Sequence, residues 1–156
     1  MHSLNNAVGS PLHNAADMTR ACDIYMQEAH QEGLGEVRAL HERAGGWYSS
    51  EVMAKAITST CMRKHGRVEH ILCLEPLHVN PALLRASLGA VVNIENTHWV
   101  ALRWLGGKVW LLDSQKPRPL PLSWNRYLDF VALHEGAFRI EVAPEMAVAT
   151  TGAASE

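Results

Sequence analysis

Long apolar runs are missing from this 156-residue chain: no stretch approaches the roughly 20 apolar residues that a helix needs to cross a bilayer. Residues 1–6 do not combine a basic segment with an apolar one, so we expect no secretory signal. An excess of positive charge is missing too, because the formal net charge is -2. The sequence therefore gives no electrostatic reason to expect binding to nucleic acid or to a membrane surface.

The spacings that are typical of metal ligands are also missing. The nine histidines are scattered without an HxxxH or HExxH pair, and Cys22, Cys61 and Cys73 have no CxxC spacing. We therefore expect no metal site, and nothing suggests another cofactor. Each cysteine lies in a regularly patterned apolar segment, which predicts buried thiols in a reducing compartment. This usage favours an intracellular protein, in the cytoplasm or the nucleus.

The most informative stretch is residues 97–114, in which two apolar, aromatic-rich runs flank Gly106-Gly107. This pattern predicts a β-hairpin with a two-residue turn. In that register His98 and Asp113 lie on the same face as diagonal cross-strand neighbours, with Cβ atoms about 7 Å apart or less. Such a pair suits a general base and the acid that orients it. A one-residue shift would separate the two side chains, and the alternative is a surface histidine beside an aspartate that serves only the turn.

The rest of the chain predicts helices first and then mostly strands, which indicates an α+β fold with an antiparallel sheet. Apolar residues at helical spacing, with caps before and glycines after, predict helices from Asn14 or Asp17 to Gly33, from Ser50 to Gly66, from Pro81 to about Leu88, and from Ser123 to Gly136. Strands are expected at 68–74, 90–94 and 137–142. Residues 31–46 lack periodicity and are interpreted as a loop or a poorly packed helical arm.

Three segments carry a family likeness. His2-Ser3-Leu4-Asn5-Asn6 resembles the H-x-L-N-N motif that opens the catalytic helix of the Josephin domain. Residues 93–99 and the following Leu-Asp-Ser resemble its histidine strand and its Asn/Asp strand, and residues 123–142 resemble its closing helix and final strand. The resemblance implies a papain-like, Josephin-type α+β fold, with an N-terminal helical half packed on an antiparallel sheet. We expect this domain to span residues 1–142, followed by a disordered tail, residues 143–156.

The resemblance implies a cysteine-type deubiquitinase that cleaves isopeptide or peptide bonds of ubiquitin or polyubiquitin conjugates, acting as a monomer. By this likeness His98 is the general base, and Asp113 fixes its tautomer and orientation. A thiolate would attack the carbonyl at the ubiquitin C-terminus, and water would then release the acyl-enzyme. The SUMO-type proteases share the histidine strand, but they place their nucleophile after the aspartate, and no cysteine follows Cys73 here.

The sequence departs from the family pattern at the nucleophile. The family cysteine lies three residues before the motif histidine, which would place it two residues before Met1, and a glutamine that precedes it in the family is missing as well. Cys22, Cys61 and Cys73 are expected in the core, so the printed residues supply no nucleophile and the chain as given is expected to be inactive. We expect that the chain begins downstream of that cysteine; the alternative is that the cysteine has been lost.

Loss of the nucleophile would leave a catalytically dead ubiquitin-binding or scaffold module. Exposed aromatic side chains would favour that function, and the candidates are Trp47, Tyr48, Trp99 and Trp124. The predicted helix from Ser50 to Gly66 is also about one turn longer than the resemblance leads us to expect.

Overall fold

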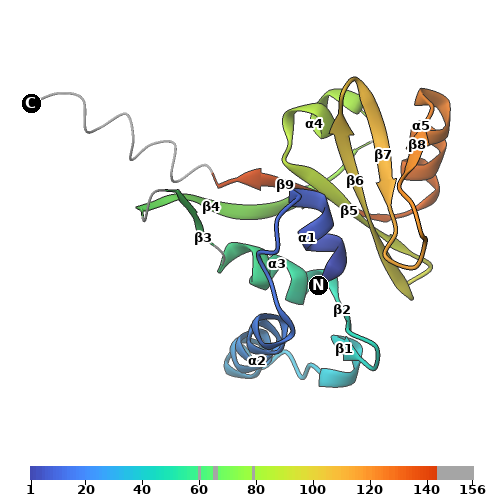
Figure 1. The fold of residues 1–156 in the computed structure, drawn as a ribbon. Helices are drawn as coiled ribbons and strands as arrows, with labels where there is room; N and C mark the ends of the chain where they lie inside the picture. Colours follow the sequence, from blue (N-terminus) through green and yellow to red (C-terminus); the bar gives the residue numbers. More distant parts are fainter. Residues whose placement is uncertain (60, 65–66, 79, 144–156) are drawn as a thin grey trace, which may run out of the picture.

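The computed structural model describes residues 1–59, 61–64, 67–78 and 80–143 (Figure 1). Within them, seven strands form one sheet in which every neighbouring pair is antiparallel, in the order β3-β4-β9-β5-β6-β7-β8. The strands are β3 (Cys61–Lys64), β4 (Arg67–Pro76), β5 (Gly89–Ile94), β6 (His98–Leu105), β7 (Lys108–Leu112), β8 (Leu120–Leu122) and β9 (Gly136–Val142).

Helices cover both faces of this sheet, so the core has two parts. On one face, α1 (His2–Val8), α2 (Ala15–Gln31) and α3 (Ser50–Thr58) build a core with residues such as Val91, Ala101 and Ile140. On the other face, α4 (Pro81–Ala86) and α5 (Trp124–Leu133) enclose a second core that includes Val92, Leu102 and Tyr127. The α+β fold with its antiparallel sheet is thereby confirmed. None of the described helices has the length and apolar character to cross a membrane.

The predicted helix starts are confirmed by their caps. Asn14 and Asp17 form a reciprocal capping box at the start of α2, and the Ser49 side chain accepts a hydrogen bond from the Val52 N–H at the start of α3. Asn80 and Ser123 cap α4 and α5 in the same way. Each cap satisfies a backbone donor that the first turn of a helix leaves without a partner.

The predicted helix from Ser50 to Gly66 is wrong in its second half, because α3 ends at Thr58. The hydroxyl groups of Thr58 and Ser59 donate hydrogen bonds to the carbonyls of Ala54 and Lys55, which competes with continuation of the helix. Cys61 therefore lies in strand β3, where it pairs with Ile71, and does not belong to a helical stripe.

Two further expectations need correction. Residues 31–46 are not a plain loop, because they contain a 3-10 turn, η1 (Arg38–Leu40), and β1 (Glu42–Arg43), which pairs with β2 (Trp47–Tyr48). In α5, helical spacing places Trp124 and Ala132 on the apolar face with Tyr127 and Val131, but Trp124 is 40% exposed and Ala132 is also exposed. Trp124 is the first residue of that helix, at the margin of the second core.

The predicted end of the domain, residue 142, lies at the margin of the described residues. Ala143 is buried, and its N–H donates to the carbonyl of Ile71 at 2.8 Å, so Ala143 also belongs to the packed structure. Residues 144–156, for which a disordered tail is predicted, lie outside the described residues.

Candidate active site

The β6–β7 hairpin has the register that the sequence predicts, with Leu105 opposite Lys108 across Gly106-Gly107. This register brings His98 and Asp113 together, and the His98 Nε2 and Asp113 Oδ1 atoms are 2.7 Å apart. Both side chains are largely buried, with 22% and 14% of their surface exposed. The predicted imidazole–carboxylate pair is therefore present.

Asp113 is held in place by the turn that follows it. Its Oδ1 atom also accepts a hydrogen bond from the Gln115 N–H at 2.9 Å, and its carbonyl accepts one from the Lys116 N–H at 3.0 Å. Burial by itself would raise the pKa of Asp113, but the hydrogen bonds from Gln115 and His98, together with the nearby charges, hold that pKa below its ordinary value of 3.8. Asp113 is thus a carboxylate at neutral pH.

The ionised state of Asp113 decides the tautomer of His98. A carboxylate can only accept hydrogen bonds, so Nε2 of His98 must carry the proton that it shares with Asp113. In the neutral ring, the other nitrogen, Nδ1, then has a free lone pair. His98 is therefore set up to accept a proton at Nδ1.

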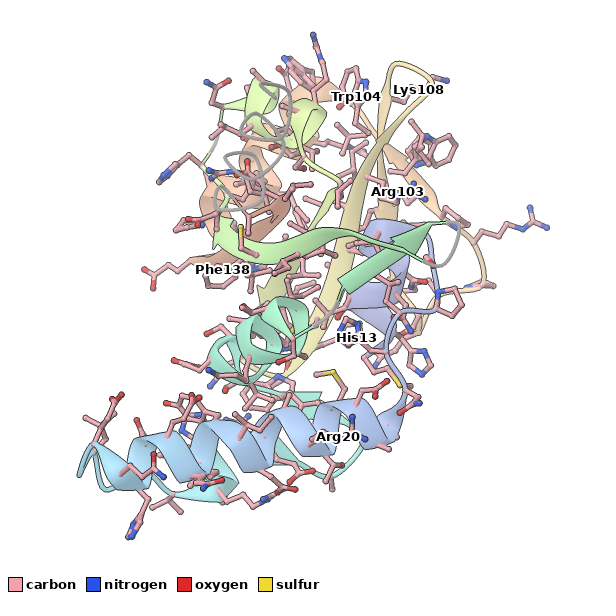
Figure 2. The ribbon with its side chains drawn as sticks, turned by 90° about the vertical axis from the view of Figure 1, so that its left-hand side faces the viewer. His13, Arg20, Arg103, Trp104, Lys108 and Phe138 are labelled. Carbon is pink, nitrogen blue, oxygen red and sulfur yellow. The ribbon has the colours of Figure 1, made fainter. Side chains whose placement is uncertain are left out.

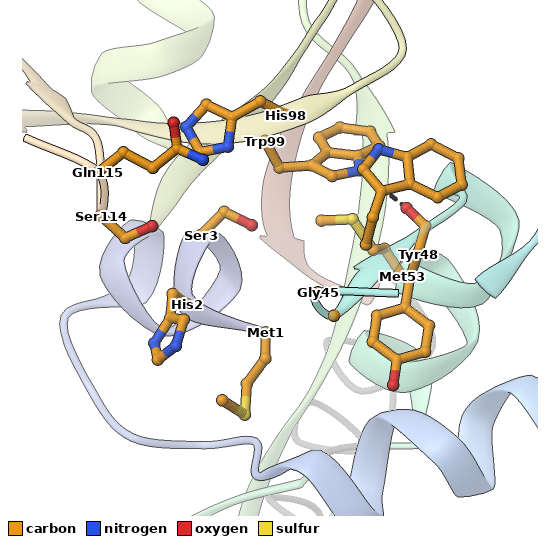
Figure 3. A pocket seen from close by; sticks show the side chains of 12 residues that line it. Met1, His2, Ser3, Gly45, Tyr48, Met53, His98, Trp99, Ser114 and Gln115 are labelled. Atoms are coloured by element: carbon orange, nitrogen blue, oxygen red, sulfur yellow. Dashed lines mark hydrogen bonds between the residues drawn. The ribbon is translucent and has the colours of Figure 1, made fainter. Parts of the chain in front are cut away.

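His98 lines a cleft of about 270 Å³ between the sheet and the helical half (Figure 3). The first residues of α1 form one part of its wall, and in Figure 3 Ser3 and Gln115 lie near the His98 ring, with Tyr48 and Met53 across the space. The lining residues are Met1, His2, Ser3, Gly45, Gly46, Trp47, Tyr48, Met53, His98, Trp99, Ser114 and Gln115.

Close packing on the sheet fixes the position of α1. Leu4 and Ala7 are completely buried against it. The carbonyl of Ala7 lies so close to Gly89, at the start of β5, that a Cβ atom there would be 2.0 Å from the oxygen. A glycine at this position therefore allows α1 to lie against the strands that carry the site.

The opposite wall comes from the β1–β2 hairpin, which sequence reasoning missed. The Trp99 indole N–H donates to the carbonyl of Tyr48 at 2.8 Å, and the Arg43 guanidinium donates to the carbonyl of Asn96 at 2.8 Å. These bonds attach the hairpin to β6 and to the turn before it. Gly45-Gly46 was the available signal, because both glycines have positive φ in the three-residue loop that joins Arg43 to Trp47.

Among the residues whose side chains the structure describes, neither Cys22 nor Cys73 lines the cleft. Cys22 is completely buried in α2, as expected, and this burial raises the pKa of its thiol. Cys73 in β4 is only half-buried, and Cys61 belongs to β3. In the part of the chain that is described, no three histidine, cysteine or acidic side chains come together as a metal site.

Among the aromatic candidates, only Trp124 is exposed. Tyr48 and Trp99 are buried, and Trp47 is half-buried at the cleft wall. Three of these four side chains, Trp47, Tyr48 and Trp99, therefore belong to the cleft and its support.

Comparison with known proteins identifies a family for this chain. The sequence model of the Josephin family matches residues 1–135, which is most of the chain and contains the hairpin, the cleft and both members of the His98–Asp113 pair. A comparison with curated proteins gave no match. The chain belongs to the Josephin family, a family of deubiquitinating cysteine proteases.

Proposed function

We propose that this domain supports cysteine-type deubiquitination, with His98 as the general base and Asp113 as the residue that orients it. The observation that carries the proposal is the 2.7 Å contact between His98 Nε2 and Asp113 Oδ1, in which His98 lines a cleft that the start of α1 also lines. Family membership supplies the class of substrate, which is ubiquitin joined to a lysine or to another chain.

The chemistry is acyl transfer. His98 takes the proton of a cysteine thiol at Nδ1, and the thiolate attacks the carbonyl carbon at the ubiquitin C-terminus. The imidazolium then gives its proton to the leaving amine as the C–N bond breaks, which leaves a thioester. Water, deprotonated by His98, attacks this thioester and restores the thiol. Asp113 stays ionised throughout and stabilises the imidazolium.

We infer that residues 1–156 do not supply the nucleophile, because no cysteine is found among the described residues that line the cleft. The family position for this cysteine is two residues before Met1, and Met1 itself lines the cleft. Residues 1–156 alone are therefore expected to react with no ubiquitin-based thiol probe. Labelling of Cys22 by such a probe would contradict this assignment.

A set of matched polypeptides tests the proposal. Residues 1–156 are compared with the same chain extended so that a cysteine stands two residues before Met1 and a glutamine about five residues earlier as an oxyanion donor. A serine in place of that cysteine is the control. Only the cysteine form should hydrolyse a fluorogenic ubiquitin C-terminal substrate, and His98→Asn within it should lower kcat about 100-fold or more. A folded cysteine form without turnover would end the enzyme proposal.

A second candidate function is a ubiquitin-binding module without catalysis. It is favoured by one observation: the described lining of the cleft includes the Trp47 side chain but no cysteine. Titration of isotope-labelled residues 1–156 with ubiquitin distinguishes the two functions. Tight binding that shifts the amides of the cleft, together with an inactive cysteine form, would establish the binding module. Turnover by the cysteine form would establish the enzyme.

A further inference from the structure

A second groove lies at the tip of the β6–β7 hairpin, on the face of the sheet that α4 and α5 cover. It has a volume of about 560 Å³, within the range of roughly 300–1,000 Å³ that is typical of ligand sites. Figure 2 shows Trp104 and Lys108 at the end of the molecule away from α2, which carries Arg20. The lining residues are Arg85, Trp104, Gly107, Lys108, Val109, Pro121, Leu122, Ser123 and Trp124.

Two tryptophans form an aromatic corner in this groove. The Trp104 and Trp124 rings meet edge to face, with centroids 5.7 Å apart and planes at 73°. Tyr127, which is completely buried, stacks under Trp124 at 5.5 Å and fixes it from below. Trp124 is nevertheless 40% exposed. Large apolar rings held rigidly at the surface lose little conformational entropy on binding, which is typical of recognition sites.

The charges around this corner are of one sign. The Arg85 guanidinium lies over the Trp104 ring, 4.6 Å from its centroid, and Lys108, the first residue of β7, is exposed. Over the described ranges neither cation takes part in an ion pair, and the groove has no acidic residue in its lining. A guanidinium stacked on an indole still presents its N–H edge to a carboxylate. The groove therefore complements an anionic, partly apolar ligand.

The adjoining sheet edge argues against binding by strand addition. β8 is only three residues long, and its central residue, Pro121, has no N–H to donate to a further strand. Recognition must then come from side chains. Aromatic grooves of this kind bind proline-containing segments, whose extended conformation is already formed before binding. Acidic residues among the prolines would contact Arg85 and Lys108.

We propose that this groove binds an extended, acidic, proline-containing segment of a partner protein. Trp104 and Trp124 contact the proline rings, and Arg85 and Lys108 pair with the carboxylates. The groove is six residues along β6 from His98, a separation of about 20 Å, so a substrate in the cleft would leave it open. The proposal is independent of the catalytic proposal and of whether a nucleophile is present.

Binding of labelled 12-residue peptides by fluorescence anisotropy tests this proposal with residues 1–156 as they are. The probe alternates proline and glutamate, and the comparison peptides replace glutamate by glutamine or by lysine. The acidic peptide should bind about tenfold more tightly than the glutamine peptide at low salt. Trp124→Ala and Lys108→Gln should each weaken its binding about threefold to tenfold, whereas Arg126→Gln, an exposed cation of α5 outside the groove lining, should not.

Three outcomes would overturn the proposal. The first is equal binding of the glutamate and glutamine peptides. The second is an effect of Arg126→Gln as large as that of Lys108→Gln, which would show non-specific attraction to surface charge. The third is tighter binding of a 12-nucleotide oligothymidylate than of the acidic peptide, because bases can also stack on tryptophan and arginine. Circular dichroism melting of each variant confirms that it remains folded.

Discussion

Replacing Gly89 by alanine tests how tightly α1 is pressed against the sheet that carries His98. The added Cβ atom would lie 2.0 Å from the carbonyl oxygen of Ala7 and 2.7 Å from its carbonyl carbon. Both are backbone atoms, so no side-chain rotation can relieve the overlap. Ordinary contact begins at 3.4 Å, so α1 and β5 must separate by about 1.4 Å.

This separation carries a cost that can be estimated. Leu4 and Ala7 of α1 are completely buried, so a shift of the helix disturbs a close-packed core. Forced expansion of such a core typically costs about 1–3 kcal/mol. We expect Gly89→Ala to lower the free energy of unfolding by about 3 kcal/mol in urea denaturation, with an unchanged slope. Amide chemical shifts of residues 1–8 should change most, because the same helix lines the cleft.

The matched control is Gly35→Ala. Gly35 also has a positive φ, of 64°, but a Cβ atom there would meet nothing within 4 Å. It should cost only the backbone penalty, about 1 kcal/mol. Equal losses in the two variants would refute the argument from close approach. Unchanged amide shifts in α1 of Gly89→Ala would show that the overlap is relieved elsewhere, and that Gly89 does not position the helix.

Three further predictions concern the site itself. Folding lowers the pKa of Asp113, so its ionised form stabilises the folded protein at pH values above the ordinary pKa of 3.8. This contribution is lost as the pH falls through the folded pKa. The Asp113→Asn variant should therefore lose less stability than the wild type between about pH 5 and pH 2, as measured by urea denaturation across pH. Gln115→Pro removes the N–H that donates to Asp113, so it should raise the midpoint of the Asp113 titration followed by carbon-13 NMR. Gln115→Ala keeps that N–H and should leave the midpoint unchanged. Equal midpoints in the two variants would contradict the role of this hydrogen bond. Trp99→Phe deletes the buried donor to the Tyr48 carbonyl and should lower the free energy of unfolding by about 1–3 kcal/mol. An unchanged denaturation midpoint would show that this bond does not hold the cleft wall.

The sequence by itself determined the features that depend on neighbouring residues. The two-residue Gly106-Gly107 turn between two apolar runs fixes the hairpin register, and this register brings His98 and Asp113 together. The starts of α2 and α5 were equally readable, because a cap such as Asn14 or Ser123 acts within one turn of its own helix.

Only the tertiary structure decided the rest of the cleft. Its second wall depends on the bonds from Trp99 to Tyr48 and from Arg43 to Asn96, which join residues 51 and 53 positions apart. No local pattern encodes such contacts, because they form only when the sheet and the helical half pack together. The same reason explains the misplaced end of α3: apolar spacing alone does not distinguish a continuing helix from a chain that leaves to pair with β4.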